Sequence, residues 1–212
     1  MNFIRKVYSI LACQLSITTA FIILVQTSSA TNDFVQANPG LYITCAIFSI
    51  VFCIMIVCCF GRTAPVNMVL LFLFTICESY MVGGLTSFYP RDIVCVAGAA
   101  TALTTTALTI YAMRTKTSIE VFAAMAFVVY FAMFPLIIIS LFVGLGALYT
   151  LYCALGVLLF SLFLIIDTMI ICKGSSMNGY RCSMDDYVIG AMMLYMDIIM
   201  LFIYILRLLG SK

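Results

Sequence analysis

The chain has 212 residues, of which 66% are hydrophobic and only 8% are charged, and its mean hydropathy is +1.25. Soluble domains carry roughly 25% charged residues, so a soluble globular fold is excluded. The net charge of +2 leaves no basic surface for nucleic acid. We therefore predict an all-α membrane protein whose main partner is the lipid bilayer, because helices satisfy their own backbone hydrogen bonds in lipid.

Seven apolar runs are long enough to span the membrane, since a helix needs about 20 such residues to cross the hydrocarbon core. They cover residues 7–25, 41–60, 67–88, 93–113, 121–143, 147–171 and 187–209. The last run contains Asp197 near its centre. We expect it to cross fully rather than to enter and return, because about 23 residues are enough to span. The prediction is one multi-pass membrane domain over residues 1–212.

Lys and Arg set the orientation, because cytoplasmic loops carry them in excess. With the N-terminus in the cytoplasm, the cytoplasmic side carries Arg5, Lys6, Arg62, Arg114, Lys116, Lys173 and Arg181, and the other side carries Arg91, Arg207 and Lys212. We therefore predict a cytoplasmic N-terminus. A full seventh crossing then places Arg207 and Lys212 on the non-cytoplasmic side, contrary to the rule that basic residues favour the cytoplasm. The first run is longer than the core of a signal peptide, so we expect it to be retained.

Cysteine and histidine usage argues against a bound cofactor or a structural metal. Most of the ten cysteines lie within the apolar runs, where a free thiol behaves as a small hydrophobe. The chain has no histidine, and its cysteines do not show the spacing of a zinc site.

Three acidic residues fall within the predicted spans: Glu78, Asp167 and Asp197. A charge inside the membrane is costly, so each marks a candidate functional site. Asp167 and Asp197 lie on consecutive antiparallel segments and could face each other, although sequence spacing leaves an offset of roughly 9 Å. Tilt, or a sixth helix that continues past Cys172, would close it. The alternative is that each aspartate bonds a neighbouring hydroxyl and only fixes packing.

A facing pair of aspartates would have a defined chemistry. Two carboxylates close together in a low-dielectric site cannot both ionise easily, so the pair shares a proton. Because the chain has no histidine, any response to pH near neutrality must come from such carboxylates or from a perturbed thiol.

Four stretches of the chain resemble the transmembrane Bax-inhibitor-motif family, most closely its lifeguard branch. They are FIRKVYSILACQL from Phe3, ESYMVGGLTSFY from Glu78, FSLFLIIDT ending at Thr168, and DDYVIGAMMLYMDIIMLFIYILRLLG from Asp185. The resemblance covers nearly the whole chain in order. It implies a seven-transmembrane-helix bundle with the last helix central, and a protein that inhibits apoptosis.

The resemblance also implies a pH-sensitive calcium leak channel in intracellular membranes. The endoplasmic reticulum or the Golgi is the expected location, with the plasma membrane as the alternative. In that family a pair of aspartates on the last two helices forms the proton-sensitive gate, and Asp167 and Asp197 match those positions and would be weak Ca²⁺ ligands. Arg62 is the candidate for the arginine that latches the pair. Glu78 is a candidate on the permeation path. Ca²⁺ would be the transported ion, because two carboxylates fall short of the 6–8 oxygens of a tight calcium site and a conducted ion must also leave.

Two departures from the family pattern matter. The Pro/Gly-rich N-terminal tail is absent, which puts partner binding through it in doubt, and Met169 stands where the family has glutamine after its D-T pair.

Two other functions remain open at this point. The first is a non-conducting anti-apoptotic interaction protein that binds apoptosis regulators or receptors and acts on death-receptor or glutamate-receptor signalling. The second is an intramembrane aspartyl protease, which is disfavoured because the GxGD motif of that family is absent: Gly144-Leu-Gly146 is followed by Ala147, and Asp197 by contrast follows Leu-Tyr-Met. We therefore expect no enzymatic activity.

Overall fold

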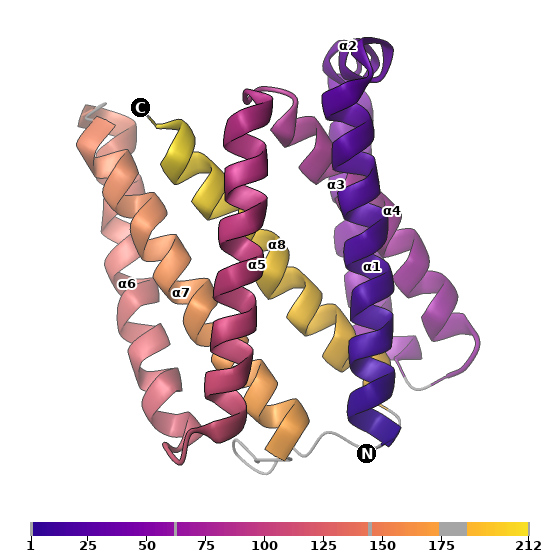
Figure 1. Ribbon diagram of the computed structural model, residues 1–212, viewed down its shortest axis with the longest axis vertical. Coiled ribbons are helices and arrows are strands. Elements are labelled where there is room, and N and C mark those ends of the chain that lie inside the picture. Colours follow the sequence, from indigo (N-terminus) through magenta and orange to yellow (C-terminus); the bar gives the residue numbers. More distant parts are fainter. Residues whose placement is uncertain (1, 62, 144–145, 174–185, 212) are drawn as a thin grey trace. The chain divides into compact units, whose positions relative to one another are not determined.

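The computed structural model describes the chain except for residues 1, 62, 144–145, 174–185 and 212. The described residues form helices and contain no strand (Figure 1). The helices are α1 (Asn2–Thr27), α2 (Ser29–Ala37), α3 (Pro39–Ile54), the π-helix η1 (Met55–Phe60), α4 (Val66–Thr86), α5 (Arg91–Arg114), α6 (Ile119–Val143), α7 (Gly146–Lys173) and α8 (Tyr187–Gly210).

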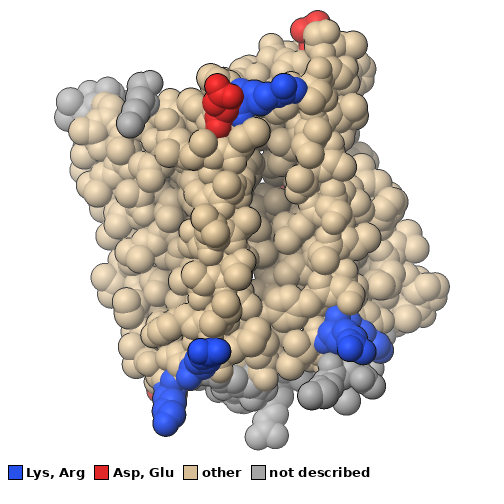
Figure 2. Space-filling view, viewed as in Figure 1, with Lys and Arg blue, Asp and Glu red and all other residues tan. Residues whose placement is uncertain are grey.

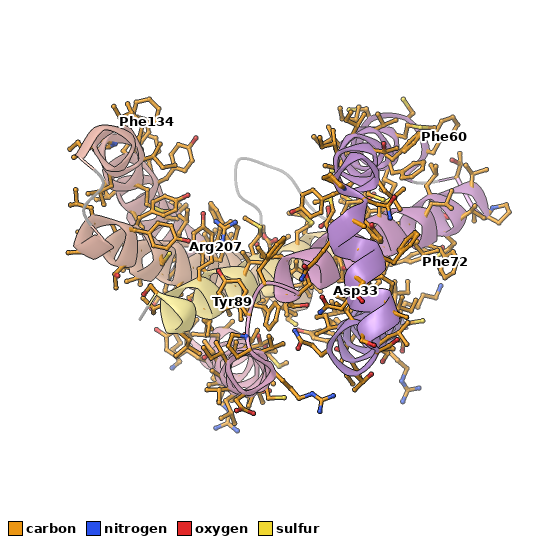
Figure 3. All side chains as sticks on the ribbon, turned by 90° about the horizontal axis from the view of Figure 1, so that it is seen from above. Asp33, Phe60, Phe72, Tyr89, Phe134 and Arg207 are labelled. Carbon is orange, nitrogen blue, oxygen red and sulfur yellow. The ribbon has the colours of Figure 1, made fainter. Side chains whose placement is uncertain are left out.

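Seven of these helical segments are long and apolar enough to cross a membrane, which confirms the predicted all-α membrane protein. α3 and η1 together make one of them, over Pro39–Phe60. On the face shown in Figure 2, charged side chains lie toward the two ends of the helices, and the described surface between them is uncharged. Large apolar side chains point outward from the helices, for example Phe72 of α4, 54% exposed, and Phe134 of α6, 63% exposed (Figure 3). Such exposure is expected where lipid is the solvent.

The chain divides into two compact units that both include part of α8. The first unit is Met1–Arg91 with Ser183–Tyr195, and the second is Asp92–Cys182 with Met196–Lys212. α8 is the most buried of the seven spans, as predicted for the last helix. One multi-pass domain stays a prediction.

α8 is one unbroken helix of 24 residues. At 1.5 Å per residue it is about 36 Å long, enough to cross a hydrocarbon core of about 30 Å. The structure thus favours a full crossing by this segment over a segment that enters and returns.

α4 is the centre of the first unit, because it contacts both α1 and α3. Close approach to α1 depends on Gly83, where an added Cβ would lie 2.6 Å from the ring of Phe21. Small residues allow helix backbones to approach closely in membranes, and Gly83 has this packing role between α4 and α1. The polar side chains of α4 are thereby enclosed between neighbouring helices.

The second unit is built on the contact between α6 and α7. Its buried apolar cluster includes Phe122 and Met133 from α6, Leu159 and Ile166 from α7, and Tyr204 from α8. The Tyr204 hydroxyl lies 2.9 Å from that of Tyr152. These contacts fix α7 and the second part of α8 side by side, which positions the acids on both.

Candidate functional site

Asp167 of α7 and Asp197 of α8 lie together in the second unit. Their side chains are joined by a hydrogen bond, and only 9% of Asp167 and 7% of Asp197 is exposed. α7 extends two residues beyond the predicted end of its span, to Lys173. This extension reduces the expected offset between Asp167 and Asp197 along the helices by about 3 Å. The rest depends on helix inclination, which the sequence does not specify.

The hydrogen bond between the two acids has a chemical consequence. An ionised carboxylate can only accept hydrogen bonds, so one of the two groups must hold a proton for the bond to exist. The other oxygen of Asp197, Oδ2, is buried and has no hydrogen-bond partner among the described residues. A hydrogen bond between two carboxyl groups thus requires a shared proton, and Oδ2 of Asp197 is left as a buried acceptor without a partner among the described residues.

The interpretation that the two aspartates only bond neighbouring hydroxyls is not supported. The hydroxyl of Thr168, next to Asp167, is buried without a partner among the described residues. The hydroxyl of Tyr195, two residues before Asp197, lies 2.9 Å from that of Thr18 instead. The two hydroxyls nearest to the aspartates in the sequence are thus not bonded to them.

Arg62, the candidate latch, lies outside the described residues, and its role stays a prediction. The glycine before it, Gly61, is packed tightly: an added Cβ would lie 2.8 Å from Cδ1 of Ile189. Gly61 also accepts a hydrogen bond of 3.1 Å from the side chain of Asn67, which is buried. The chain just before the latch position is therefore held to α4 and to the start of α8, all within the first unit.

Glu78 lies in the first unit, on the buried side of α4, and is 6% exposed. The hydroxyl of Ser49 on α3 donates a hydrogen bond to its Oε1. Glu78 belongs to the first unit and the aspartate pair to the second, so each acidic site is described within its own unit.

A cluster of neutral polar side chains surrounds the same part of α4. Gln14 of α1 donates to the hydroxyl of Thr75 at 3.0 Å. The hydroxyl of Thr18, also on α1, lies 2.9 Å from those of both Ser79 and Tyr195. Sequence reasoning missed this cluster, although α1 and α4 each carry two of its members four residues apart, the spacing that places side chains on one face.

The described residues contain no group of three or more Cys, Asp or Glu side chains that could hold a metal ion. The aspartate pair offers four carboxyl oxygens, against the 6–8 that calcium takes. This is too few oxygens for a tight calcium site.

The fold and the buried acids define a polytopic helical membrane protein with ionisable groups inside its spans. The chain matches, over residues 1–212, the family described as "Inhibitor of apoptosis-promoting Bax1". It belongs to that family, and membership supports an anti-apoptotic role in a membrane.

Three relatives show where in the family it falls. The chain is 34% identical to protein lifeguard 3 of Homo sapiens, over its full length and 69% of that protein. It is 30% identical to lifeguard 3 of Mus musculus, with the same coverage, and 34% identical to lifeguard 4 of Mus musculus, of which it covers 85%. The predicted resemblance to the lifeguard branch is thus confirmed. None of these names describes an enzyme.

Proposed function

We propose that the protein is a pH-sensitive calcium leak channel of intracellular membranes, which modulates calcium homeostasis and thereby inhibits apoptosis. The observation that carries this proposal is the buried hydrogen bond between Asp167 and Asp197. Because that bond needs a shared proton, the contact between α7 and α8 at this point depends on the proton concentration. Loss of the proton leaves two like charges in a low-dielectric site, where their repulsion is strong.

The same geometry supports the proposed leak. Once the proton has left, the pair presents carboxylate oxygens, which are the ligands that Ca²⁺ prefers. Calcium is the cargo of this site, and the small number of oxygens allows it to leave again. Glu78 is a candidate on the permeation path, and Arg62 is a candidate latch for the pair. The endoplasmic reticulum or the Golgi is the proposed location, with the N-terminus in the cytoplasm.

The test is calcium flux into liposomes that contain the purified protein and an internal calcium dye, measured over a pH series. Asp167→Asn and Asp197→Asn keep the size of the side chain but cannot share an acid proton in the same way. We expect both variants to lose most of the pH dependence of the flux. Asp33→Asn is the matched control, because Asp33 is exposed. Unchanged flux and pH dependence in both site variants would refute the proposal.

The competing function, a non-conducting interaction protein, makes the opposite prediction in cells. A double variant, Asp167→Asn with Asp197→Asn, that conducts no calcium but still protects cells from death at parent expression levels would favour it. Loss of protection together with flux would favour the leak.

A further inference from the structure

Glu78 has an environment that differs from that of the aspartate pair. It is buried between α3 and α4, with 6% of its side chain exposed, and its hydrogen-bond donor, Ser49, is 5% exposed. α3, η1 and α4 contain no Lys or Arg. On α1, Lys6 lies over the ring of Tyr187, about 18 Å along the helix from the level of Thr18. No described basic side chain therefore compensates a charge on Glu78.

The groups that face Glu78 from the neighbouring helices are neutral. α3 provides Cys53 and α8 provides Tyr195, both close enough to interact with a charge on Glu78. Cys77 does so from α4 itself, and Cys58 of η1 interacts with Cys53 instead. α1 contributes only the amide of Gln14 and the hydroxyl of Thr18 to this region. Thiols and phenols are uncharged at neutral pH, so none of them balances the carboxylate.

We propose that Glu78 and Ser49 form a second proton-binding site inside the membrane, separate from the aspartate pair. An ionised carboxyl without a counter-charge is costly in the bilayer, so a proton neutralises Glu78 in the described packing. The Ser49 hydroxyl donates to the carboxyl and favours its ionised form. Ser49 is thus a positioning residue that makes release of the proton from Glu78 easier. Its hydrogen bond keeps α3 in contact with α4 whether Glu78 is protonated or ionised.

A second observation points to an exchangeable ligand at this level of the first unit. The Oε1 atom of Gln14 is buried and has no hydrogen-bond partner among the described residues, and Gln14 is only 4% exposed. Its amide nitrogen is bound to Thr75, one turn before Glu78 on α4. A buried acceptor without a donor is uncommon, and a water or hydronium at this position would satisfy it.

The experiment uses dicyclohexylcarbodiimide, an apolar reagent that reacts with protonated carboxyl groups. The acid proton moves to one carbodiimide nitrogen, the carboxyl oxygen bonds to the central carbon, and the adduct rearranges to a stable N-acylurea. The full-length protein in lipid nanodiscs is labelled over a pH series, and the label on Glu78 is measured by peptide mass spectrometry. We expect labelling at acidic pH that falls about tenfold per pH unit above the midpoint.

Variants identify the role of Ser49. Ser49→Ala removes the donor, so labelling of Glu78 should persist to a pH higher by about one unit or more, the size expected for a hydrogen bond to a charged group. Ser49→Thr keeps the hydroxyl and should restore the parent profile. Ser87→Ala is the matched control, because that hydroxyl bonds only the carbonyl of Gly84 in its own chain segment. A Ser49→Ala profile that coincides with the parent would show that Ser49 has no such role and would overturn the proposal.

The site is tested apart from the proposed leak. In the double variant Asp167→Asn with Asp197→Asn, Glu78 should keep its label and its pH profile. Loss of that profile would show that the acids form one coupled site, against the proposal. Absence of label on Glu78 at every pH, in a protein whose thermal stability matches the parent, would also overturn it. Neither result depends on calcium flux, so failure here is distinct from failure of the leak.

Discussion

α7 and α8 pack tightly against each other at Gly156, and Gly156→Ala tests this contact. A Cβ at this position would lie 2.3 Å from Cδ1, 2.4 Å from Cε1 and 2.6 Å from Cγ of Tyr204. The ring of Tyr204 cannot easily turn away. It is stacked on Phe160 at a centroid distance of 5.6 Å, and its hydroxyl lies 2.9 Å from that of Tyr152.

The magnitude follows from those distances. Cγ is the ring atom next to the backbone of α8, so relief of the clash requires the helices to separate rather than one side-chain tip to move. Overpacking of this kind typically costs about 1–3 kcal/mol. The higher helix propensity of alanine recovers up to about 1 kcal/mol. For a chain of this size we expect a melting temperature lower by roughly 2–8 °C.

The assay is thermal unfolding of the purified protein in detergent, with Gly98→Ala as the control. Gly98 is also inside a helix, α5, but an added Cβ there would meet nothing within 4 Å, so this variant should be neutral or slightly stabilising. Replacement of Tyr204 by Leu in the Gly156→Ala background should recover stability relative to the sum of the two single changes. Equal melting temperatures for Gly156→Ala and Gly98→Ala would refute the packing described here.

Two further stability predictions concern hydroxyl contacts. Thr18→Val removes the hydroxyl that bridges Ser79 and Tyr195, and it should lower the free energy of unfolding by about 1–3 kcal/mol, measured by thermal unfolding. Thr19→Val changes an exposed position and should cost little. Equal losses of stability in the two variants would contradict a role for the bridge. Tyr152→Phe and Tyr204→Phe should each cost about 0.5–1.5 kcal/mol, and the double variant should cost less than their sum because both remove one hydrogen bond. Additive losses would show that the bond does not contribute.

The spans could be predicted from sequence because membrane thickness sets their length. The predicted runs 147–171 and 187–209 correspond to α7, Gly146–Lys173, and α8, Tyr187–Gly210. The π-helix η1 at Met55–Phe60 could not be predicted in the same way. It changes the hydrogen-bond register of the backbone, and the side chains over that stretch remain a continuous apolar run.

The acidic sites could be predicted from the sequence, whereas the polar cluster of α1, α4 and α8 could not. A charge within an apolar run is conspicuous, whereas Thr, Ser and Gln are common in membrane helices and satisfy themselves locally. Their long-range partners are 61 residues away for Gln14 and 177 for the pairing of Thr18 with Tyr195. A single sequence does not contain those pairings, since helix rotation and packing decide them.

The two acidic sites should respond differently to the loss of a proton, because their partners differ. At the aspartate pair both partners are acceptors, so deprotonation removes the hydrogen bond that joins α7 to α8. At Glu78 the partner is the hydroxyl of Ser49, which can donate to the acid and to the carboxylate alike. Deprotonation there adds a charge but keeps the contact between α3 and α4. Of these two sites, the aspartate pair is the one at which a change of protonation would directly break a contact between helices, which is why we propose Asp167 and Asp197, rather than Glu78, as the gate.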